Sequence, residues 1–200
     1  MSHRKLLALA LTLTAIPAVA IVPGTTAPDF KGTDSNGTQH SLSEYRGKYV
    51  VLEWANKGCP YDQKHYLSGS MENLQKEWTA KGVVWLSVIS SAPGEQGYVT
   101  GSQENEYIKS MHAAPTAVLL DPTGTIARLY EAKTTPHIFV IDPTGKLIYQ
   151  GALDDKPTPD QEDLKGARNY LNEVLTAAMA GKPVPIASTR PYGCSVKYAH

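Results

Sequence analysis

Two short apolar segments, YVVLEWAN at 49–56 and VVWLSVIS at 83–90, constrain the fold more than any other feature of the sequence. Both are rich in β-branched and aromatic residues, which predicts strands buried on both faces, as at the centre of a parallel sheet. Between them we predict an amphipathic helix from Pro60 to about Lys81, ended by Gly82. Its apolar residues recur at spacings of four, three and four: Leu67, Met71, Leu74 and Trp78. The resulting β-α-β unit indicates an α/β fold.

Shorter patterns predict the elements around this unit. The Asn-Gly pair in SNGT favours a small hairpin between 28 and 46. No internal repeat or low-complexity tract interrupts the chain, so one domain is expected. The other predicted elements are a helix from about Gln103 to Met111, a strand at 116–121, a helix at 125–132, an antiparallel hairpin of 137–142 with 146–152, and a final helix from Asp160 to Ala180.

The N-terminus has the order of a secretory leader. Arg4 and Lys5 precede an apolar run, and small residues follow up to Ala20. The run is too short to cross a bilayer as a helix, and no stop-transfer pattern follows it. We therefore predict a signal peptide at 1–20, cleaved after Ala20, and a periplasmic or secreted protein; an uncleaved anchor is the alternative.

The charge balance gives no reason to expect a nucleic acid or a membrane surface as partner. The chain has 19 basic and 19 acidic side chains, which gives a formal net charge of +0. Beyond the leader we expect one domain at 21–185 and a C-terminal tail at 186–200.

The chain contains only two cysteines, Cys59 and Cys194, and an oxidising compartment favours their pairing. Cys59 lies at the carboxyl end of the first predicted strand, the edge at which open α/β sheets place their chemistry. Pro60 starts the following helix, whose N-terminal N–H groups and dipole favour a thiolate at Cys59. An inert buried thiol is the alternative.

Several neighbours of Cys59 are candidates for supporting roles. Asp62 would be the third helical residue, where a carboxylate caps N-terminal donors or relays protons, although its negative charge would oppose the thiolate. Lys57 could add positive potential. Lys64 and His65 could do so too, but solvated positions on the helix explain them better. His65 has no second histidine or cysteine at ligand spacing, so we predict no metal site.

Two aromatic residues flank the cysteine in sequence. Trp54 and Tyr61 could shape a substrate groove, although a tryptophan in this position fits the core better. Arg128 could stabilise an anionic group, but an exposed helix position is the simpler interpretation.

The order of these segments resembles the thioredoxin-like redoxins, in particular the alkyl hydroperoxide reductase and thiol-specific antioxidant family. The resemblance covers about Ala27 to Gly181. The tail STRPYGCSVKY at 188–198 resembles the end of a peroxiredoxin-like branch with a Gly-Cys near the C-terminus. The segments that carry the resemblance are APDF at 27–30, SLSEYRGKYVVLEW at 41–54, the Cys-Pro helix start, and TTPHIFVID at 134–142 with the hairpin after it.

The resemblance implies an α/β protein of thioredoxin fold, with three α/β/α layers, a mixed central sheet, an N-terminal hairpin and a C-terminal tail. It also implies Cys59 as the reactive cysteine and a cis bond between Thr135 and Pro136 facing it, with no cofactor. Ordinary thioredoxins carry a second cysteine at the place of Asp62, so a disulfide within the motif is excluded.

A second departure concerns peroxide chemistry. Typical peroxiredoxins have a proline and a hydroxyl residue where this chain has Leu52 and Asn56. The missing hydroxyl argues against efficient activation of a peroxide.

We therefore expect a thiol–disulfide oxidoreductase in which Cys59 attacks and Cys194 resolves. Cys194 is the eleventh residue after Pro183, and eleven residues span roughly 35 Å when extended, so the tail can reach the site. The expected partners are a thiol or disulfide protein, or a small hydroperoxide, and an external thiol reductant. The alternatives are a peroxiredoxin-like hydroperoxide reductase with antioxidant activity, and a non-catalytic module in which the two cysteines form a structural disulfide.

Overall fold

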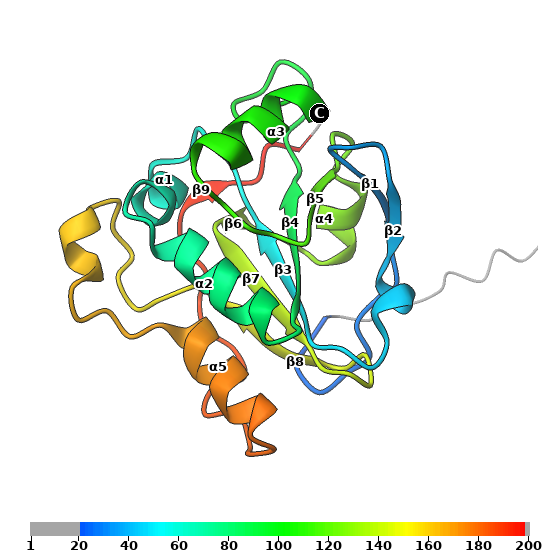
Figure 1. The fold of residues 1–200 in the computed structure, drawn as a ribbon, viewed down its shortest axis with the longest axis vertical. Helices are drawn as coiled ribbons and strands as arrows, with labels where there is room; N and C mark the ends of the chain where they lie inside the picture. Colours follow the sequence, from blue (N-terminus) through cyan, green and yellow to red (C-terminus); the bar gives the residue numbers. More distant parts are fainter. Residues whose placement is uncertain (1–20, 199–200) are drawn as a thin grey trace, which may run out of the picture.

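The structure is a computed structural model that describes residues 21–198. A seven-stranded mixed sheet forms the centre of the protein, and Figure 1 shows its strands surrounded by helices. Its strand order is β2-β1-β5-β4-β3-β7-β8. The central strands β3, β4 and β5 run parallel, and the flanking pairs are antiparallel. The strands are β1 (Lys31–Asp34), β2 (Gln39–Ser41), β3 (Val50–Trp54), β4 (Val84–Ile89), β5 (Ala117–Leu120), β7 (His137–Ile141) and β8 (Leu147–Gly151).

The two apolar segments and both predicted hairpins are confirmed. Every residue of β3 and β4 is buried, as expected for strands covered on both sides. β1 pairs with β2 across the Asn-Gly turn, and β7 pairs with β8.

The helix predicted from Pro60 to Lys81 is wrong as a continuous element. It consists of α1 (Pro60–Leu67) and α2 (Ser70–Ala80). Gly69 between them has φ 77°, a left-handed conformation that ends one helix and redirects the chain into the next. As a result Leu67, predicted on the apolar face, is 57% exposed, whereas Met71, Leu74 and Trp78 of α2 are buried.

The last predicted helix is also too long. Residues 161–164 form a 3₁₀ turn, and α5 covers only Tyr170–Met179. Gly166 has φ 78°, and Asn169 starts α5 by accepting a hydrogen bond from the Asn172 backbone N–H at 2.8 Å. The remaining helices, α3 (Gly101–Ser110) and α4 (Thr125–Leu129), lie where the sequence predicted helices.

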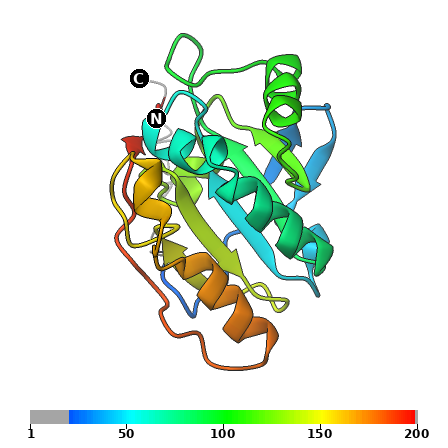
Figure 2. The ribbon, with the colours of Figure 1, turned by 60° about the vertical axis from the view of Figure 1, so that its left-hand side comes forward.

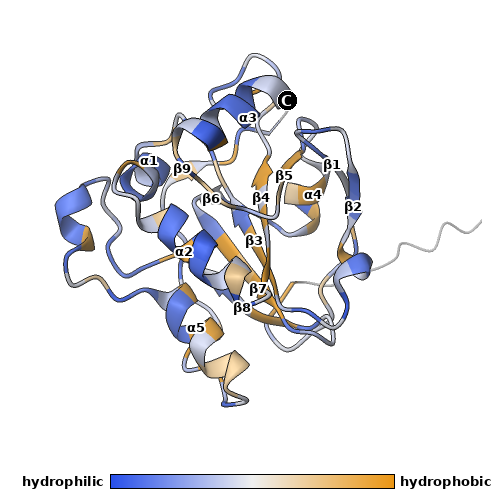
Figure 3. Ribbon diagram, in the orientation of Figure 1, coloured by the Kyte–Doolittle hydropathy of each residue, from blue (hydrophilic) through white to orange (hydrophobic). Residues whose placement is uncertain are grey.

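Helices cover both faces of the sheet, so the predicted three-layer α/β/α architecture is confirmed (Figure 2). α2 and α5 pack on one face, and α4 packs on the other with the N-terminal segment. In Figure 3, strand β4 is hydrophobic while α3 is mostly hydrophilic, which is the pattern of a buried sheet under amphipathic helices.

The C-terminal tail returns along the sheet edge toward α1. It first follows β8, where Gln150 and Ala187 share a backbone hydrogen bond of 3.1 Å. It then forms β9 (Cys194–Ser195), which pairs antiparallel with β6 (Thr134–Thr135) in a separate two-stranded ladder. The sequence showed no pattern for this ladder, and it carries Cys194 to the site.

The predicted leader lies outside the described residues. Within residues 21–198, no helix is both long and apolar enough to cross a membrane.

Candidate active site

A short turn after β3 places Cys59 at the carboxyl edge of the sheet. Asn56 builds this turn: its side-chain oxygen accepts from the Gly58 N–H, and its backbone carbonyl accepts from the Cys59 N–H, both at 2.8 Å. Cys59 is the N-cap of α1, with Pro60 in the first turn as predicted. The sulfur therefore lies at the positive end of an eight-residue helix.

The Cys59 thiol is fully covered, with 0% of the residue exposed. Its Sγ donates to the backbone carbonyl of Thr135 at 3.1 Å. In the β6–β9 ladder Cys194 lies opposite Thr135, and both cysteines are free thiols within hydrogen-bonding reach of each other. The structure thus brings the two cysteines together, and the strand that carries Cys194 helps to bury Cys59.

The Thr135–Pro136 bond is cis, as the family resemblance implied. Gly193 packs directly on this segment with φ 131°, and a Cβ atom there would lie 2.0 Å from the Thr135 carbonyl oxygen. Only glycine allows so close an approach, which explains the Gly-Cys pair in the tail.

The two thiols have opposite electrostatic surroundings. Burial raises the pKa of Cys59, but hydrogen bonds from the Cys194 side chain and from the Asp62 and Cys194 backbone outweigh it, so this pKa lies below the ordinary 9.0 of a thiol. Burial and the neighbouring Cys59 raise the pKa of Cys194 to about 12. The negative charge of the pair therefore forms first on Cys59.

Of the two roles predicted for Asp62, the structure bears on capping: the carboxyl group binds a donor of the turn before α1. One carboxyl oxygen accepts from the Asn56 backbone N–H, in the turn before α1, and the other has no partner among the described residues. Burial, with a smaller contribution from Glu53, raises the pKa of Asp62 well above its usual value. The raised pKa disfavours the charged carboxylate, which weakens the opposition of Asp62 to a thiolate at Cys59.

Glu53 is a buried site residue that the sequence reasoning missed. Its carboxyl group accepts from four side chains: Trp85 Nε1 at 2.7 Å, Ser87 Oγ at 2.8 Å, Tyr66 hydroxyl at 2.9 Å and Gln75 Nε2 at 3.2 Å. Its burial, only partly offset by these hydrogen bonds, raises its pKa. A glutamate inside the apolar segment YVVLEW was the available signal, because a charge in a buried strand needs partners.

A third buried carboxyl group, that of Glu104 in α3, is close enough to Asp62 and Glu53 to interact with them electrostatically. Burial raises its pKa to about 7, partly offset by Lys57. Within residues 21–198, no group of three or more His, Cys, Asp or Glu side chains is arranged to hold a metal ion.

The interpretation of Lys64 and His65 as solvated helix residues is wrong. Both are buried against Asp154, with Lys64 Nζ 3.5 Å and His65 Nε2 3.7 Å from its Oδ2. Burial lowers the pKa of His65 to about 4, so its ring is neutral near pH 7. These side chains lie under the C-terminal tail because α1 packs against it here.

The aromatic residues divide between core and site. Trp54 is fully buried, donates from Nε1 to Ser90 Oγ at 3.0 Å and packs on Phe139, so it shapes no groove. Tyr61 lies beside Tyr192 of the tail, with ring centroids 6.0 Å apart. Arg128 stacks its guanidinium over the Tyr198 ring at 4.4 Å.

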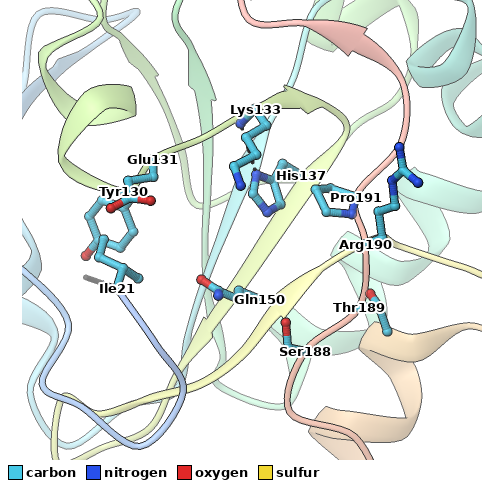
Figure 4. A pocket seen from close by; sticks show the side chains of 10 residues that line it. All are labelled: Ile21, Tyr130, Glu131, Lys133, His137, Gln150, Ser188, Thr189, Arg190 and Pro191. Atoms are coloured by element: carbon cyan, nitrogen blue, oxygen red, sulfur yellow. Dashed lines mark hydrogen bonds between the residues drawn. The ribbon is translucent and has the colours of Figure 1, made fainter.

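Two cavities border the tail. One, of about 590 Å³, is lined by residues that include Thr134, Tyr192 and Gly193 and so lies next to Cys194. The other, of about 440 Å³, lies between β7, β8 and the tail, with Lys133, His137 and Gln150 in its wall (Figure 4). Burial, with a smaller contribution from Lys133, lowers the pKa of His137 to about 3. No cysteine is among the residues that line either cavity.

Comparisons with solved structures agree with this architecture. A hypothetical protein from Sinorhizobium meliloti 1021 superimposes with a TM-score of 0.75 at 22% identity, covering 90% of this chain and 97% of that one. A putative thiol:disulfide interchange protein DsbE from Chlorobium tepidum gives a TM-score of 0.52 at 26% identity, covering 66% of this chain and 85% of that one.

Sequence comparisons point in the same direction. Thiol-disulfide oxidoreductase ResA of Geobacillus kaustophilus is 27% identical over 128 residues, which are 64% of this chain and 68% of that protein. Thioredoxin-like protein YneN of Bacillus subtilis is 28% identical over 149 residues, 73% of this chain and 82% of that protein. The model of the AhpC/TSA family matches residues 23–150, more than half of the chain. This chain therefore belongs to the AhpC/TSA family of thioredoxin-like redoxins.

Proposed function

We propose that this protein is a thiol–disulfide oxidoreductase in which Cys59 is the nucleophilic thiolate and Cys194 the resolving cysteine. The observation that carries the proposal is the proximity of the two free thiols: β9 places Cys194 opposite Thr135, whose carbonyl the Cys59 sulfur contacts. Membership of a thiol-dependent oxidoreductase family and the similarity to ResA support the class of reaction.

The chemistry needs only these two sulfurs and an external disulfide. The Cys59 thiolate attacks one sulfur of the substrate disulfide, and the other substrate sulfur leaves as a thiolate. Cys194 then loses its proton and attacks the Cys59 sulfur, so that the second substrate sulfur leaves and the Cys59–Cys194 disulfide forms. Two electrons pass from the protein to the substrate, and an external dithiol returns them.

The full burial of Cys59 adds one requirement to this scheme. Its sulfur contacts the Thr135 carbonyl under β9, so a disulfide substrate reaches it only when residues 193–195 move off β6. The ladder has two residues on each strand, which is short enough to open locally.

The relevant substrate class is a protein or small-molecule disulfide outside the cytoplasm. The predicted leader supports this location, as does the similarity to an exposed lipoprotein thioredoxin of Streptococcus pneumoniae, 25% identical with a TM-score of 0.51.

Turnover with oxidised glutathione and a dithiol reductant tests the proposal, with intact-mass analysis of the protein between cycles. We expect an internal disulfide to form and to be reduced again by the dithiol. A Cys59–Cys194 disulfide that survives a mild dithiol in the folded protein would instead identify a structural bond.

A hydroperoxide reductase is the second candidate, favoured by the family match. In that reaction the Cys59 thiolate would attack the terminal peroxide oxygen, the O–O bond would break, and an alcohol, or water from hydrogen peroxide, would leave with a proton from solvent. The resulting sulfenic acid would react with the Cys194 thiol to give the disulfide with release of water. Leu52 and Asn56 replace the usual proline and hydroxyl residue, so we expect slow reaction with peroxide. Thiol loss within seconds at modest peroxide concentration would favour the peroxidase.

A further inference from the structure

A buried ion pair lies under the tail that carries Cys194. Nζ of Lys64 is 3.5 Å from Oδ2 of Asp154, and the two side chains are 0% and 2% exposed. Tyr192, two residues before Cys194, completes this pair: its hydroxyl donates to Oδ1 of Asp154 and accepts from Lys64 Nζ at 3.1 Å. A buried ion pair is stable only when its remaining hydrogen-bonding positions are filled, so the Tyr192 hydroxyl is a structural part of it.

The same cluster connects the tail to the helix that carries Cys59. Lys64 is in α1, five residues after Cys59, and also donates to the Lys156 carbonyl at 2.7 Å. The Lys156 N–H in turn donates to Oδ1 of Asp154 at 2.8 Å. The tail, the loop after β8 and α1 therefore meet at one fully buried group of charges.

We propose that Lys64, Asp154 and Tyr192 anchor the tail so that Cys194 stays next to Cys59, which makes them positioning residues for the resolving step. This inference rests on the proposed function, because it concerns the attack of Cys194 on an adduct at Cys59.

The geometry of the tail supports the anchor. Gly193 is the single residue between Tyr192 and Cys194, and two residues span at most about 7 Å. When β9 leaves β6 to admit a substrate, an anchored Tyr192 keeps Cys194 within about 7 Å of Tyr192, and so near the site. A thiol held so closely has a high effective concentration for the Cys59 sulfur, which favours rapid resolution.

The tail is also attached beyond Cys194. The Val196 N–H donates to the Lys133 carbonyl at 3.1 Å, and the Tyr198 hydroxyl donates to the Ala132 carbonyl at 2.6 Å. The segment that moves is therefore short, and the anchor at Tyr192 determines how far its N-terminal end travels.

The test removes one hydroxyl and follows the resolving step directly. Reduced Tyr192→Phe protein and reduced wild type are mixed with oxidised glutathione, quenched at intervals and analysed by intact mass. In the resolving step the Cys194 thiolate bonds to the Cys59 sulfur, while glutathione leaves as a thiolate and takes up the proton that Cys194 released. Wild type is expected to show the internal disulfide with little adduct. Tyr192→Phe is expected to accumulate the Cys59 adduct and to resolve it about tenfold more slowly, as for loss of a hydrogen bond to a charged group.

Two measurements distinguish a loss of Cys194 positioning from a general loss of structure in Tyr192→Phe. The effective concentration of Cys194, measured from the equilibrium with glutathione, should fall with the resolving rate. The rate of adduct formation, compared in the Cys194→Ser background, should not fall. Tyr49→Phe is the matched control, because it removes a hydroxyl that donates to the Ala178 carbonyl at 2.9 Å, at the far end of α5.

Resolution by Tyr192→Phe at the wild-type rate would overturn the anchor while leaving the proposed function intact. Failure of wild type to form either adduct or internal disulfide would overturn the proposed function itself. Asp154→Asn provides a second variant, which keeps the side-chain volume and is expected to slow the same step.

Discussion

The surroundings of Cys59 and those of Cys194 differ in almost every physical respect. Cys59 lies at the N-terminus of α1 and is fully buried, and its pKa lies below that of an ordinary thiol. Cys194 lies on a two-residue strand that is partly exposed, and its thiol has a raised pKa. This contrast indicates two different roles. The β3–α1 unit stabilises a thiolate at Cys59, and the tail supplies Cys194 as a thiol that can move.

The contrast also explains why a buried cysteine is compatible with the proposed chemistry. The Cys59 sulfur contacts the Thr135 carbonyl of β6 and lies within hydrogen-bonding reach of Cys194 in β9, so a two-residue ladder borders it. A ladder of this kind opens at a much lower free-energy cost than the core.

The largest predicted effect comes from removing each sulfur. Cys59→Ser should lower turnover with oxidised glutathione to the uncatalysed level, because the low-pKa thiolate is lost. Cys194→Ser should still form the Cys59 adduct but no internal disulfide. Intact-mass analysis measures both outcomes. Equal adduct formation in the two variants would contradict the assigned roles.

The next prediction concerns the pH dependence of the two thiols. Thiolate absorbance in the ultraviolet, which does not require access to reagent, should show a first ionisation below pH 9.0 and a second at about 12. At pH 7 this separation corresponds to at least about a thousandfold difference in thiolate population. Because the thiols are coupled, these transitions belong to the pair, and the single-cysteine variants assign them. A single joint transition near the ordinary thiol value would remove the asymmetry.

A smaller effect is expected on the stability of the fold, from the buried carboxyl group of Glu104. The pKa of Glu104 is raised by burial to about 7 from 4.5, so the folded protein holds a proton there that the unfolded chain releases. Stability therefore falls as pH rises from about 4.5 to about 7 and stays lower above this range. Glu104→Gln removes this penalty and should stabilise the protein at pH 8 by about 3 kcal/mol.

Chemical denaturation of wild type and Glu104→Gln at pH 4 and pH 8 measures this difference. The free energies of unfolding should nearly converge at pH 4, where the carboxyl group is mostly protonated in both states. Equal stability of the two proteins at pH 8 would show that Glu104 is not held neutral by burial.

The smallest predicted effect concerns Lys197, whose charge acts on the Cys194 thiol. The charge of Lys197 lowers the pKa of Cys194, against the larger effects of burial and of Cys59. Lys197→Gln should raise this pKa slightly and slow resolution by less than about threefold, since Lys197 is only partly buried and solvent and salt screen its charge. A loss as large as that expected for Tyr192→Phe would mean that charge, more than the anchor, controls the tail thiol.

Local sequence patterns predicted the elements whose contacts are close in the chain or strongly periodic. The segments YVVLEWAN and VVWLSVIS, the Cys-Pro helix start and both hairpins all lie where expected. The two errors in helix length occur at Gly69 and Gly166, where a glycine with positive φ interrupts a pattern that apolar spacing alone would continue.

The sequence by itself determined the α/β class and the position of Cys59 at the start of a helix, because strand and helix periodicity depend on neighbouring residues. Only the tertiary structure decided that Cys194 lies opposite Thr135, that Lys64 is buried beside Tyr192, and that the pKa of Asp62 is raised. The first two depend on contacts between residues far apart in the chain, and the third on burial in the folded interior. No local pattern encodes such contacts, since they form only when the tail packs against the completed sheet.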